Sequence, residues 1–384
     1  MKLAGIGVLA LVALASTASG ATSHANGRVL FTQGYSYLEE GYGGIYAINP
    51  DGTGRVLITN AGSNGVWSPD GRKILFESSR KGDLDLWTVG ANGAGAKEIT
   101  FSVGRDADGT WSPDGSHIAF ESNRNNLAGA DVFVVDASGK GATRLTPGTG
   151  FNGDPAYSPD GAKIAFTSDR GGSRDIWVMN SDGSGATRLT TAAGTDENPT
   201  WSPDGKQIAF DTDRSEPGNL DVWAMNDDGS NQHEVFASPA LDAVPSWSPD
   251  GRFIAFASER TGKGERKVYV GRADGSDVRL LAAPATPRNY VNQGASVPDW
   301  GVRPAGDRCT IEGTVHRETL VGTSHRDVIC GNGGGDTIRA GGGDDVIYAA
   351  DRARDAIDGG PGRDIAYLDR VEARVAHVEI KRVR

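Results

Sequence analysis

Acidic side chains stand just before a short motif that the chain repeats, Trp-Ser-Pro-Asp-Gly or, in one copy, Tyr-Ser-Pro-Asp-Gly. These acidic residues are Asp106, Asp108, Asp154, Asp196, Glu197 and Asp242, with Asn152 and Asn198 at equivalent places. If the repeats surround one axis, the side-chain oxygens converge and could bind Ca²⁺, or a cationic or hydroxyl-rich ligand. The alternative interpretation is that Asp and Asn in the loops before these strands cap turns.

A second acidic series runs through the C-terminal tail with spacings of nine or ten residues: Glu318, Asp327, Asp336, Asp345, Asp355 and Asp364. An apolar residue stands two places after almost every one of them, and Gly is frequent just before. Gly permits tight turns that bring backbone carbonyls near an ion, and a carboxylate in each turn supplies oxygen ligands for Ca²⁺. Without a cation the stacked carboxylates would repel one another, so we expect the tail to fold with calcium.

This rhythm resembles the GGxGxDxUx nonapeptide of RTX proteins, which form a calcium-binding parallel β-roll. The clearest units are residues 331–339, 340–348 and 359–367. The resemblance implies Ca²⁺ ligands at Asp327, Asp336, Asp345, Asp355 and Asp364. Several turns depart from the pattern, since 313–321 and 322–330 lack the expected glycines. The alternative is a glycine-rich solenoid that holds one ion or none.

The two cysteines, Cys309 and Cys330, lie at the start of this tail. In an exported protein such a pair is expected to form a disulfide, which would contribute roughly 3 kcal/mol. We predict a tail domain over residues 309–384, in which residues 371–384 form a terminal strand that caps the roll.

The repeated motif predicts the fold of the larger part of the chain. Its copies begin at residues 67, 111, 157, 201 and 247, so they are 44, 46, 44 and 46 residues apart. Pro and Asp suit the middle of a tight turn, and Gly accepts the left-handed conformation that closes it. A short apolar strand follows each turn, and two further strands complete each period. Four strands in a period of this length are typical of one blade of a β-propeller.

Each strand type occurs six times. The series begins on a second-type strand at Val29 and ends on a first-type strand at Trp300. We therefore expect the strand around Trp300 to complete the sheet begun at residues 28–33 and to close the ring. The predicted fold is all-β: a six-bladed β-propeller over residues 27–303 with ring closure between its termini, followed by a small parallel β-roll or solenoid.

The whole repeat, from WSPDG through IAF and (S/T)xxR to D(I/V)W and DGSG, resembles the TolB family of β-propellers. The resemblance covers the propeller and does not include the additional N-terminal domain that TolB carries. It implies a periplasmic protein that binds partners in the cell envelope. Related propellers precede peptidase domains, but no GxSxG nucleophile elbow follows the propeller here.

Residues 1–25 predict a secretory signal peptide, because Lys2 precedes an apolar run that ends in small residues. An uncleaved membrane anchor is the alternative. We expect an exported monomer, secreted or held in the periplasm or cell envelope, with no membrane span. The net charge of −11 argues against a nucleic-acid partner.

These features predict a non-enzymatic binding or scaffold protein whose propeller face binds a protein or glycan partner, with a calcium-binding tail. The alternative is a calcium-assisted glycan lyase, or a lactone or ester hydrolase, that uses the acidic channel mouth. Hydrolysis needs a proton-transfer group or a metal with an open position. The propeller histidines, His117 and His233, do not fall near the predicted mouth. A third possibility is a structural spacer.

Overall fold

The computed structural model describes residues 26–33, 43–125, 129–148, 150–262, 266–282 and 296–302, and in the tail 311–312, 317–331, 335–349, 354–368 and 374–382. The predicted signal peptide lies outside these ranges. All the regular elements within them are β-strands, apart from one isolated bridge. None of the described segments is a helix long and apolar enough to cross a membrane.

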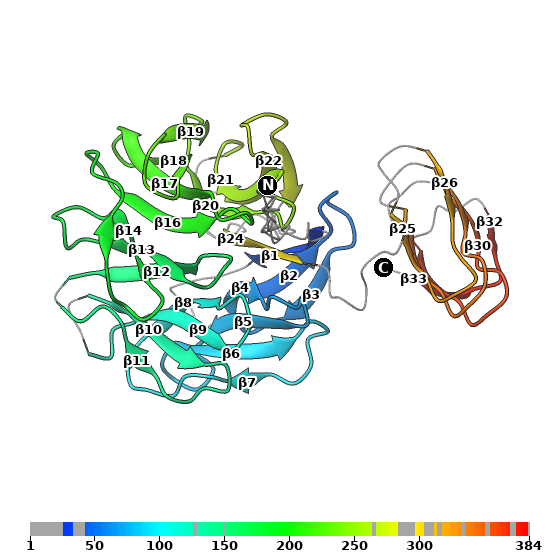
Figure 1. Ribbon diagram of the computed structural model, residues 1–384, viewed down its shortest axis with the longest axis horizontal. Coiled ribbons are helices and arrows are strands. Elements are labelled where there is room, and N and C mark those ends of the chain that lie inside the picture. The colour runs from blue at the N-terminus through cyan, green and yellow to red at the C-terminus, as the bar shows by residue number, and fades with distance from the viewer. Residues whose placement is uncertain are drawn as a thin grey trace, which may run out of the picture.

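Six four-stranded antiparallel sheets form the blades of a propeller, with the first strand of each blade nearest the central axis (Figure 1). Blade 1 consists of β24 (Ser296–Val302), β1 (Asn26–Gln33), β2 (Gly44–Ile48) and β3 (Val56–Thr59). Blade 2 consists of β4 (Ser63–Trp67), β5 (Lys73–Ser78), β6 (Asp85–Gly90) and β7 (Lys97–Glu98). Blade 3 consists of β8 (Asp106–Trp111), β9 (His117–Ser122), β10 (Asp131–Asp136) and β11 (Thr143–Arg144).

The other three blades repeat this order. Blade 4 consists of β12 (Asn152–Tyr157), β13 (Lys163–Ser168), β14 (Asp175–Asn180) and β15 (Thr187–Arg188). Blade 5 consists of β16 (Asp196–Trp201), β17 (Gln207–Glu216), β18 (Asn219–Asn226) and β19 (His233–Phe236). Blade 6 consists of β20 (Asp242–Trp247), β21 (Phe253–Ser258), β22 (Lys267–Arg272) and β23 (Arg279–Ala282).

The predicted ring closure is confirmed, because β24 pairs antiparallel with β1 to complete blade 1. Val29 lies opposite Trp300 and Leu30 opposite Asp299 in this pair. The first and last strands of the propeller thus share one sheet, in which β24 covers the inner edge of β1 and ties the two ends of the propeller together. The six-bladed, all-β architecture predicted from the repeats is therefore correct.

The repeated pentapeptide makes the turn between the first and second strands of a blade. In blade 2 the N–H of Gly71 donates to the carbonyl of Ser68 at 2.8 Å, and Gly71 has φ of 68°. The Ser68 hydroxyl donates to Asp70 at 2.6 Å and accepts the N–H of Lys73 at 2.9 Å. Ser68 and Asp70 are therefore required by these hydrogen bonds. Gly71 is required because a residue with a Cβ would be strained at this φ.

The middle of each blade is apolar. The six second strands each bury one phenylalanine to 1% exposure or less: Phe31, Phe76, Phe120, Phe166, Phe210 and Phe256. Three motif tryptophans, Trp111, Trp201 and Trp247, are 7–8% exposed and pack in clusters that join neighbouring blades. Each blade therefore depends on its neighbours for the burial of its faces.

The tail strands form two parallel sheets, and successive strands alternate between them as in a small β-roll (Figure 1). One sheet contains β25 (Ile311–Glu312), β27 (Val328–Cys330), β29 (Val346–Ala349), β31 (Ile365–Leu368) and β33 (Glu379–Arg382). The other contains β26 (Thr319–Val321), β28 (Thr337–Arg339), β30 (Ala356–Asp358) and β32 (Arg374–Ala376). The apolar residues of the nonapeptide rhythm, such as Ile329, Ile338 and Ile347, are fully buried between the sheets.

The end of the tail differs from the prediction of one capping strand. Two short strands, β32 and β33, each extend one of the sheets in parallel. His377, with φ of 52°, lies between them, and Val375 and Val378 pack against the roll core. The apolar spacing continues the roll by one more turn, so these residues add to the solenoid instead of crossing its end.

Candidate functional site

The acidic residues predicted at the channel mouth fall into two structural groups. Asp106, Asp196 and Asp242 are the first residues of their inner strands and are at most 2% exposed. Each forms an ion pair with an arginine of its own blade, at 2.5 Å with Arg124, 2.8 Å with Arg214 and 2.9 Å with Arg260. Their charges are balanced and their side chains are fixed, so these three have a structural role, although through ion pairs with arginines instead of the predicted turn caps.

Blade 4 has an amide at the same place. The Oδ1 atom of Asn152 accepts a hydrogen bond from Arg170 at 2.7 Å. The arginines in this position also lie over aromatic rings, for example Arg124 at 5.0 Å from the Phe133 centroid. Asp or Asn therefore serves the same structural purpose here, which is to hold the arginine between the inner strand and the blade core.

Asp108, Asp154 and Glu197 form the second group and lie together near the axis. A β-bulge follows the second residue of each inner strand and places the third residue at positive φ. Asp108 and Asp154 occupy this third position with φ of 47° and 49°. Asp and Asn tolerate this conformation better than most residues, and the bulge redirects their side chains.

Three further acids of this region come from the second strands and were not predicted: Glu77, Glu121 and Asp211. Each directly follows the buried phenylalanine of its strand and is at most 3% exposed. An acidic residue in an otherwise apolar central strand is the signal that could have found them. Two of them also bind the next blade, since the N–H of Asp108 donates to Glu77 at 2.8 Å and that of Val244 to Asp211 at 2.8 Å.

Asp108, Glu121 and Asp154 form the tightest acidic group, with one possible ligand atom from each residue lying within 4.8 Å of the other two. Arg105 makes ion pairs with both Glu121 and Asp108. Arg174 makes an ion pair with Glu197. Among the described residues the six acids at the mouth thus have ion pairs with only these two arginines, which leaves an excess of negative charge.

Burial raises the pKa of most of these carboxyls. Desolvation, with a smaller repulsion from Asp108, raises the pKa of Glu77 to about 7 and that of Asp154 to about 7. Desolvation raises the pKa of Asp211 to about 8 and holds the pKa of Glu121 well above its usual range. Neutralising these groups, by protons or by a cation, is therefore favourable.

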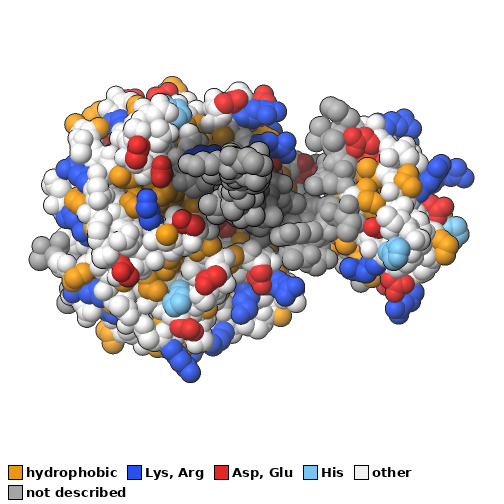
Figure 2. Space-filling model, viewed as in Figure 1, with side chains coloured by type: hydrophobic (Ala, Val, Ile, Leu, Met, Phe, Trp, Pro, Cys, Tyr) orange, Lys and Arg blue, Asp and Glu red, His pale blue; other side chains and the backbone are white. Residues whose placement is uncertain are grey.

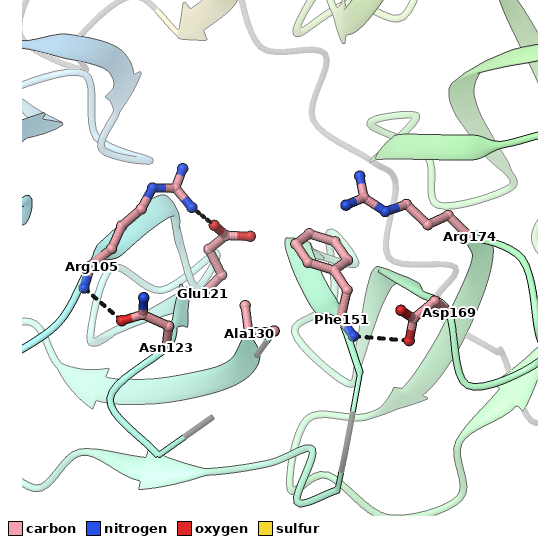
Figure 3. A pocket seen from close by; sticks show the side chains of 8 residues that line it. Arg105, Glu121, Asn123, Ala130, Phe151, Asp169 and Arg174 are labelled. Carbon is pink, nitrogen blue, oxygen red and sulfur yellow. Dashed lines mark hydrogen bonds and ion pairs between the residues drawn. The ribbon is translucent and has the colours of Figure 1, made fainter. Parts of the chain in front are cut away.

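An open pocket of about 390 Å³ lies beside this group between blades 3 and 4 (Figure 3). Arg105 and Glu121 form one wall and Phe151 and Arg174 the other. The Arg174 guanidinium lies 4.2 Å from the centroid of the Phe151 ring. Elsewhere on the visible described surface of the propeller, acidic, basic and apolar side chains are mixed (Figure 2). The mouth is therefore the most distinctive feature of this unit.

In the tail, the acidic series forms two ladders, one along each sheet. Each carboxylate accepts the backbone N–H of the acidic residue two places earlier in the series, which precedes it in the same ladder, at 2.7–2.9 Å for Asp336, Asp345, Asp355 and Asp364. The five aspartates of the series are at most 5% exposed. The second carboxylate oxygens of Asp336, Asp345 and Asp364 are buried and accept no hydrogen bond from a described residue.

The ladders have the chemistry that calcium requires. Burial raises the pKa of Asp336 and Asp345, because the charged form lacks compensation. A hard cation would compensate the negative charge of these carboxylates. Buried carboxylate oxygens and the backbone carbonyls of the turns are suitable ligands for it. The residues present therefore fit Ca²⁺, although the side chains also have a structural task in satisfying backbone N–H groups.

The other predicted residues take no part in these sites within the described chain. Cys330 is buried in β27, and Cys309 lies outside the described residues, so the disulfide stays a prediction. His117 and His233 are exposed residues at the start of β9 and β19. Neither belongs to the acidic group at the mouth, so neither could serve there as the proton-transfer group of a hydrolase.

Comparison with known proteins agrees with this geometry. A sequence profile described as the TolB beta propeller domain matches residues 34–146, 110–216 and 192–299. This chain belongs to the TolB beta propeller domain family. No match was found among curated protein sequences.

Solved structures show the same fold. TolB from Acinetobacter baumannii is 23% identical with a TM-score of 0.62, over 72% of this chain and 67% of that one. The putative TolB from Agrobacterium tumefaciens is 21% identical with a TM-score of 0.55, over 73% and 98%. Hydrazine synthase from Kuenenia stuttgartiensis is 15% identical with a TM-score of 0.56, over 73% and 48%. At these identities the comparison shows that the TolB-like propeller fold is shared, and it carries no information about which ligands this chain binds.

Proposed function

We propose that this protein is an exported binding scaffold, in which the acidic mouth of the TolB-like propeller binds a partner and the tail binds calcium. The observation that carries the proposal is the convergence of six carboxylates from blades 2 to 5, which in the described part of the chain have ion pairs with only two arginines. A partner that brings positive charge to this place lowers the cost of keeping the carboxylates ionised. Export rests on the signal peptide predicted at residues 1–25 and implies a periplasmic, envelope or secreted location.

The partner that fits the mouth best is a protein segment with lysine or arginine side chains. The test uses a photoreactive side chain at Ala193, an exposed residue of the loop that leads into β16. Lys206 is the matched control, because it is exposed at the turn after the opposite end of the same strand. We expect a covalent product in the exporting cell from position 193 and not from 206. Equal labelling at both positions, or none at 193, would contradict the proposal.

Two calcium sites of different kinds form the second part of the proposal. At the mouth, Asp108, Glu121 and Asp154 would supply three oxygens, and the buried hydroxyl of Thr167, on the strand next to β12, interacts with Asp154. In the tail, Asp327, Asp336, Asp345, Asp355 and Asp364 would bind Ca²⁺ within the glycine-rich turns. Ca²⁺ takes six to eight oxygens, so backbone carbonyls or water complete each set.

Calorimetric titration of the full mature chain with Ca²⁺ separates the two kinds of site. Asp345→Asn should remove binding at the tail, and Asp154→Asn should remove binding at the mouth. Asp106→Asn is the control, since Asn152 shows that an amide fills that position in another blade. A chain that binds no Ca²⁺, or variants that bind as the parent does, would defeat the calcium assignments and leave the partner-binding role to the labelling test.

A further inference from the structure

The pocket between blades 3 and 4 carries two guanidinium groups that face one open space from opposite walls (Figure 3). Arg105 enters from the loop before β8 and Arg174 from the loop before β14. Their side chains are 48% and 46% exposed, so both can be reached by a ligand. The pocket is formed by two blades and is therefore a property of the assembled propeller.

Both arginines are held in place with hydrogen-bonding capacity left over. Arg105 is fixed by Glu121 and Asp108. Arg174 lies against the Phe151 ring and uses Nη1 for Glu197, while its Nε and Nη2 atoms donate to no described residue. A guanidinium has five N–H donors, and a fixed pair of them is a strong receptor for a carboxylate.

The rest of the pocket offers both donors and acceptors. The Oδ1 atom of Asn123 accepts the N–H of Arg105 at 2.8 Å, which leaves its amide nitrogen available to a ligand. Asp169 Oδ1 accepts the N–H of Phe151 at 2.9 Å, which leaves Oδ2. The apolar surface is small and consists mainly of the Phe151 ring and the methyl group of Ala130.

We propose that this pocket binds a carboxylate-bearing sugar, that is, a uronic acid residue of a glycan. Arg174 and Arg105 would bind the carboxylate, Asn123 and Asp169 the ring hydroxyls, and Phe151 the apolar edge of the ring. A volume of about 390 Å³ has room for one such ring with its flanking atoms.

A sugar fits better than an acidic peptide side chain. A glutamate or aspartate side chain has few hydrogen-bonding groups beyond its carboxylate, so it would leave Asn123 and Asp169 without ligand partners. A uronic acid has hydroxyl groups around its ring and satisfies donors and acceptors together.

This inference rests on the proposed role of the propeller as a binding unit. It assigns an anionic ligand to the arginine pocket, which lies beside the acidic group and is separate from the place proposed for the cationic partner. It requires no chemical step. It also predicts that recognition depends on the carboxylate and on the ring together, which a nonspecific charge effect would not reproduce.

The test is calorimetric titration of the full mature chain with sodium galacturonate, galactose and N-acetylglutamate, in which galactose lacks the carboxylate and N-acetylglutamate lacks the ring. We expect galacturonate to bind at least tenfold more tightly than either. If galactose binds as tightly as galacturonate, the arginines do not recognise the carboxylate. If N-acetylglutamate binds as tightly, the pocket does not recognise a sugar ring. Failure of all three to bind would overturn the site.

Variants assign the binding to the pocket. Arg174→Gln should weaken galacturonate binding about tenfold or more, and Arg174→Lys should give an intermediate loss because the charge remains without the planar fork. Arg272→Gln is the control, since Arg272 is 48% exposed and pairs with Asp277 in the β22–β23 hairpin of blade 6. Equal losses in Arg174→Gln and Arg272→Gln would overturn the assignment. If galacturonate binds but position 193 gives no covalent product, the proposed protein partner is refuted and the sugar-binding pocket is supported.

Discussion

The carboxylate of Glu77 in blade 2 accepts the backbone N–H of Asp108 in blade 3 at 2.8 Å, so a channel acid of one blade holds the bulge of the next. The same contact joins Asp211 to Val244 between blades 5 and 6 at 2.8 Å. Glu77 also accepts the side-chain amide of Asn64 at 2.9 Å. The acids at the mouth therefore have two effects, because they link the ring and also concentrate negative charge near its axis.

Glu77→Leu should destabilise the propeller more than Glu77→Gln. Glutamine keeps an oxygen that accepts the Asp108 N–H. Leucine leaves that donor without its partner and leaves the Asn64 amide with only the longer hydrogen bond to Asp108, at 3.3 Å. An unsatisfied buried group costs about 1–3 kcal/mol. Urea denaturation of both variants measures the difference. If the two variants unfold at the same urea concentration, the contact between the blades contributes nothing measurable.

Val244→Asn should stabilise the protein. Val244 has φ of 55° at the bulge position where the other blades place Asn64, Asp108, Asp154 and Asn198. A β-branched residue is disfavoured in this left-handed region by roughly 1–2 kcal/mol, and asparagine is among the residues that tolerate it best. We expect a gain of about 1 kcal/mol in the free energy of unfolding.

Asn198→Val is the matched reverse substitution. It should lower the free energy of unfolding by a similar amount because of the backbone strain. It should lower it somewhat further because the 3.0 Å hydrogen bond from Asn198 to Asp211 is lost. Opposite signs for the two substitutions in thermal melts would agree with strain at this φ. A loss of stability in both would show that side-chain packing, not backbone conformation, decides this position.

The ring closure should weaken as the pH rises. Asp299 Oδ2 accepts the N–H of Trp67 at 2.7 Å, and burial raises the pKa of Asp299 to about 7. The folded state thus binds this proton more tightly than the unfolded state, in which the pKa is about 4. The resulting stabilisation is complete below about pH 4 and is lost as the pH rises through about 7.

Asp299→Asn keeps an acceptor for Trp67 and removes the buried charge. We expect it to raise stability at about pH 8 by on the order of 1–2 kcal/mol and to flatten the change between about pH 5.5 and 8. Melting curves in a calcium chelator at both pH values measure this. Glu77, Asp154 and Asp211 contribute pH dependence of the same sign, so the slope should decrease and not vanish. An unchanged slope would show that Asp299 is charged in the folded state at both pH values.

The blades could be predicted from the sequence because their signal is local and repeated. The Ser68-to-Gly71 turn depends on the conformational preferences of its own residues, and five copies fix the period. Ring closure followed from counting strand types, and Trp300 lies where that count requires. In the tail, the nine-residue rhythm likewise placed the buried isoleucines correctly.

The mouth was predicted only in part, because its geometry depends on features that the sequence pattern does not show. Asp106 and Asp108 are two residues apart, and regular strand alternation would put them on the same side. The bulge after Ala107 breaks this alternation, so one side chain pairs with Arg124 and the other faces the acidic group. Glu121 was missed because it follows the motif and joins Asp154 only across the blade boundary.

The tail offers a test of glycine at single positions. Gly360 has φ of 82°, and a Cβ there would come within 1.9 Å of the Gly341 carbonyl oxygen in the turn below. Gly360→Ala should therefore prevent the turns from stacking and destabilise the roll. Gly342→Ala is the matched control, next to Gly341 in the turn below, because a Cβ there meets its nearest atoms at 3.8 Å, an ordinary contact.

Hydrogen exchange of the full chain with and without Ca²⁺ reports on the two units separately. In Gly360→Ala we expect loss of protection over residues 322–368 and unchanged protection in the propeller strands. Gly342→Ala should keep the protection of the parent to within a few tenths of a kcal/mol, as expected for a tolerated small substitution. Equal protection of the roll in both variants would mean that the stacked turns have room for a side chain, contrary to the geometry at Gly360.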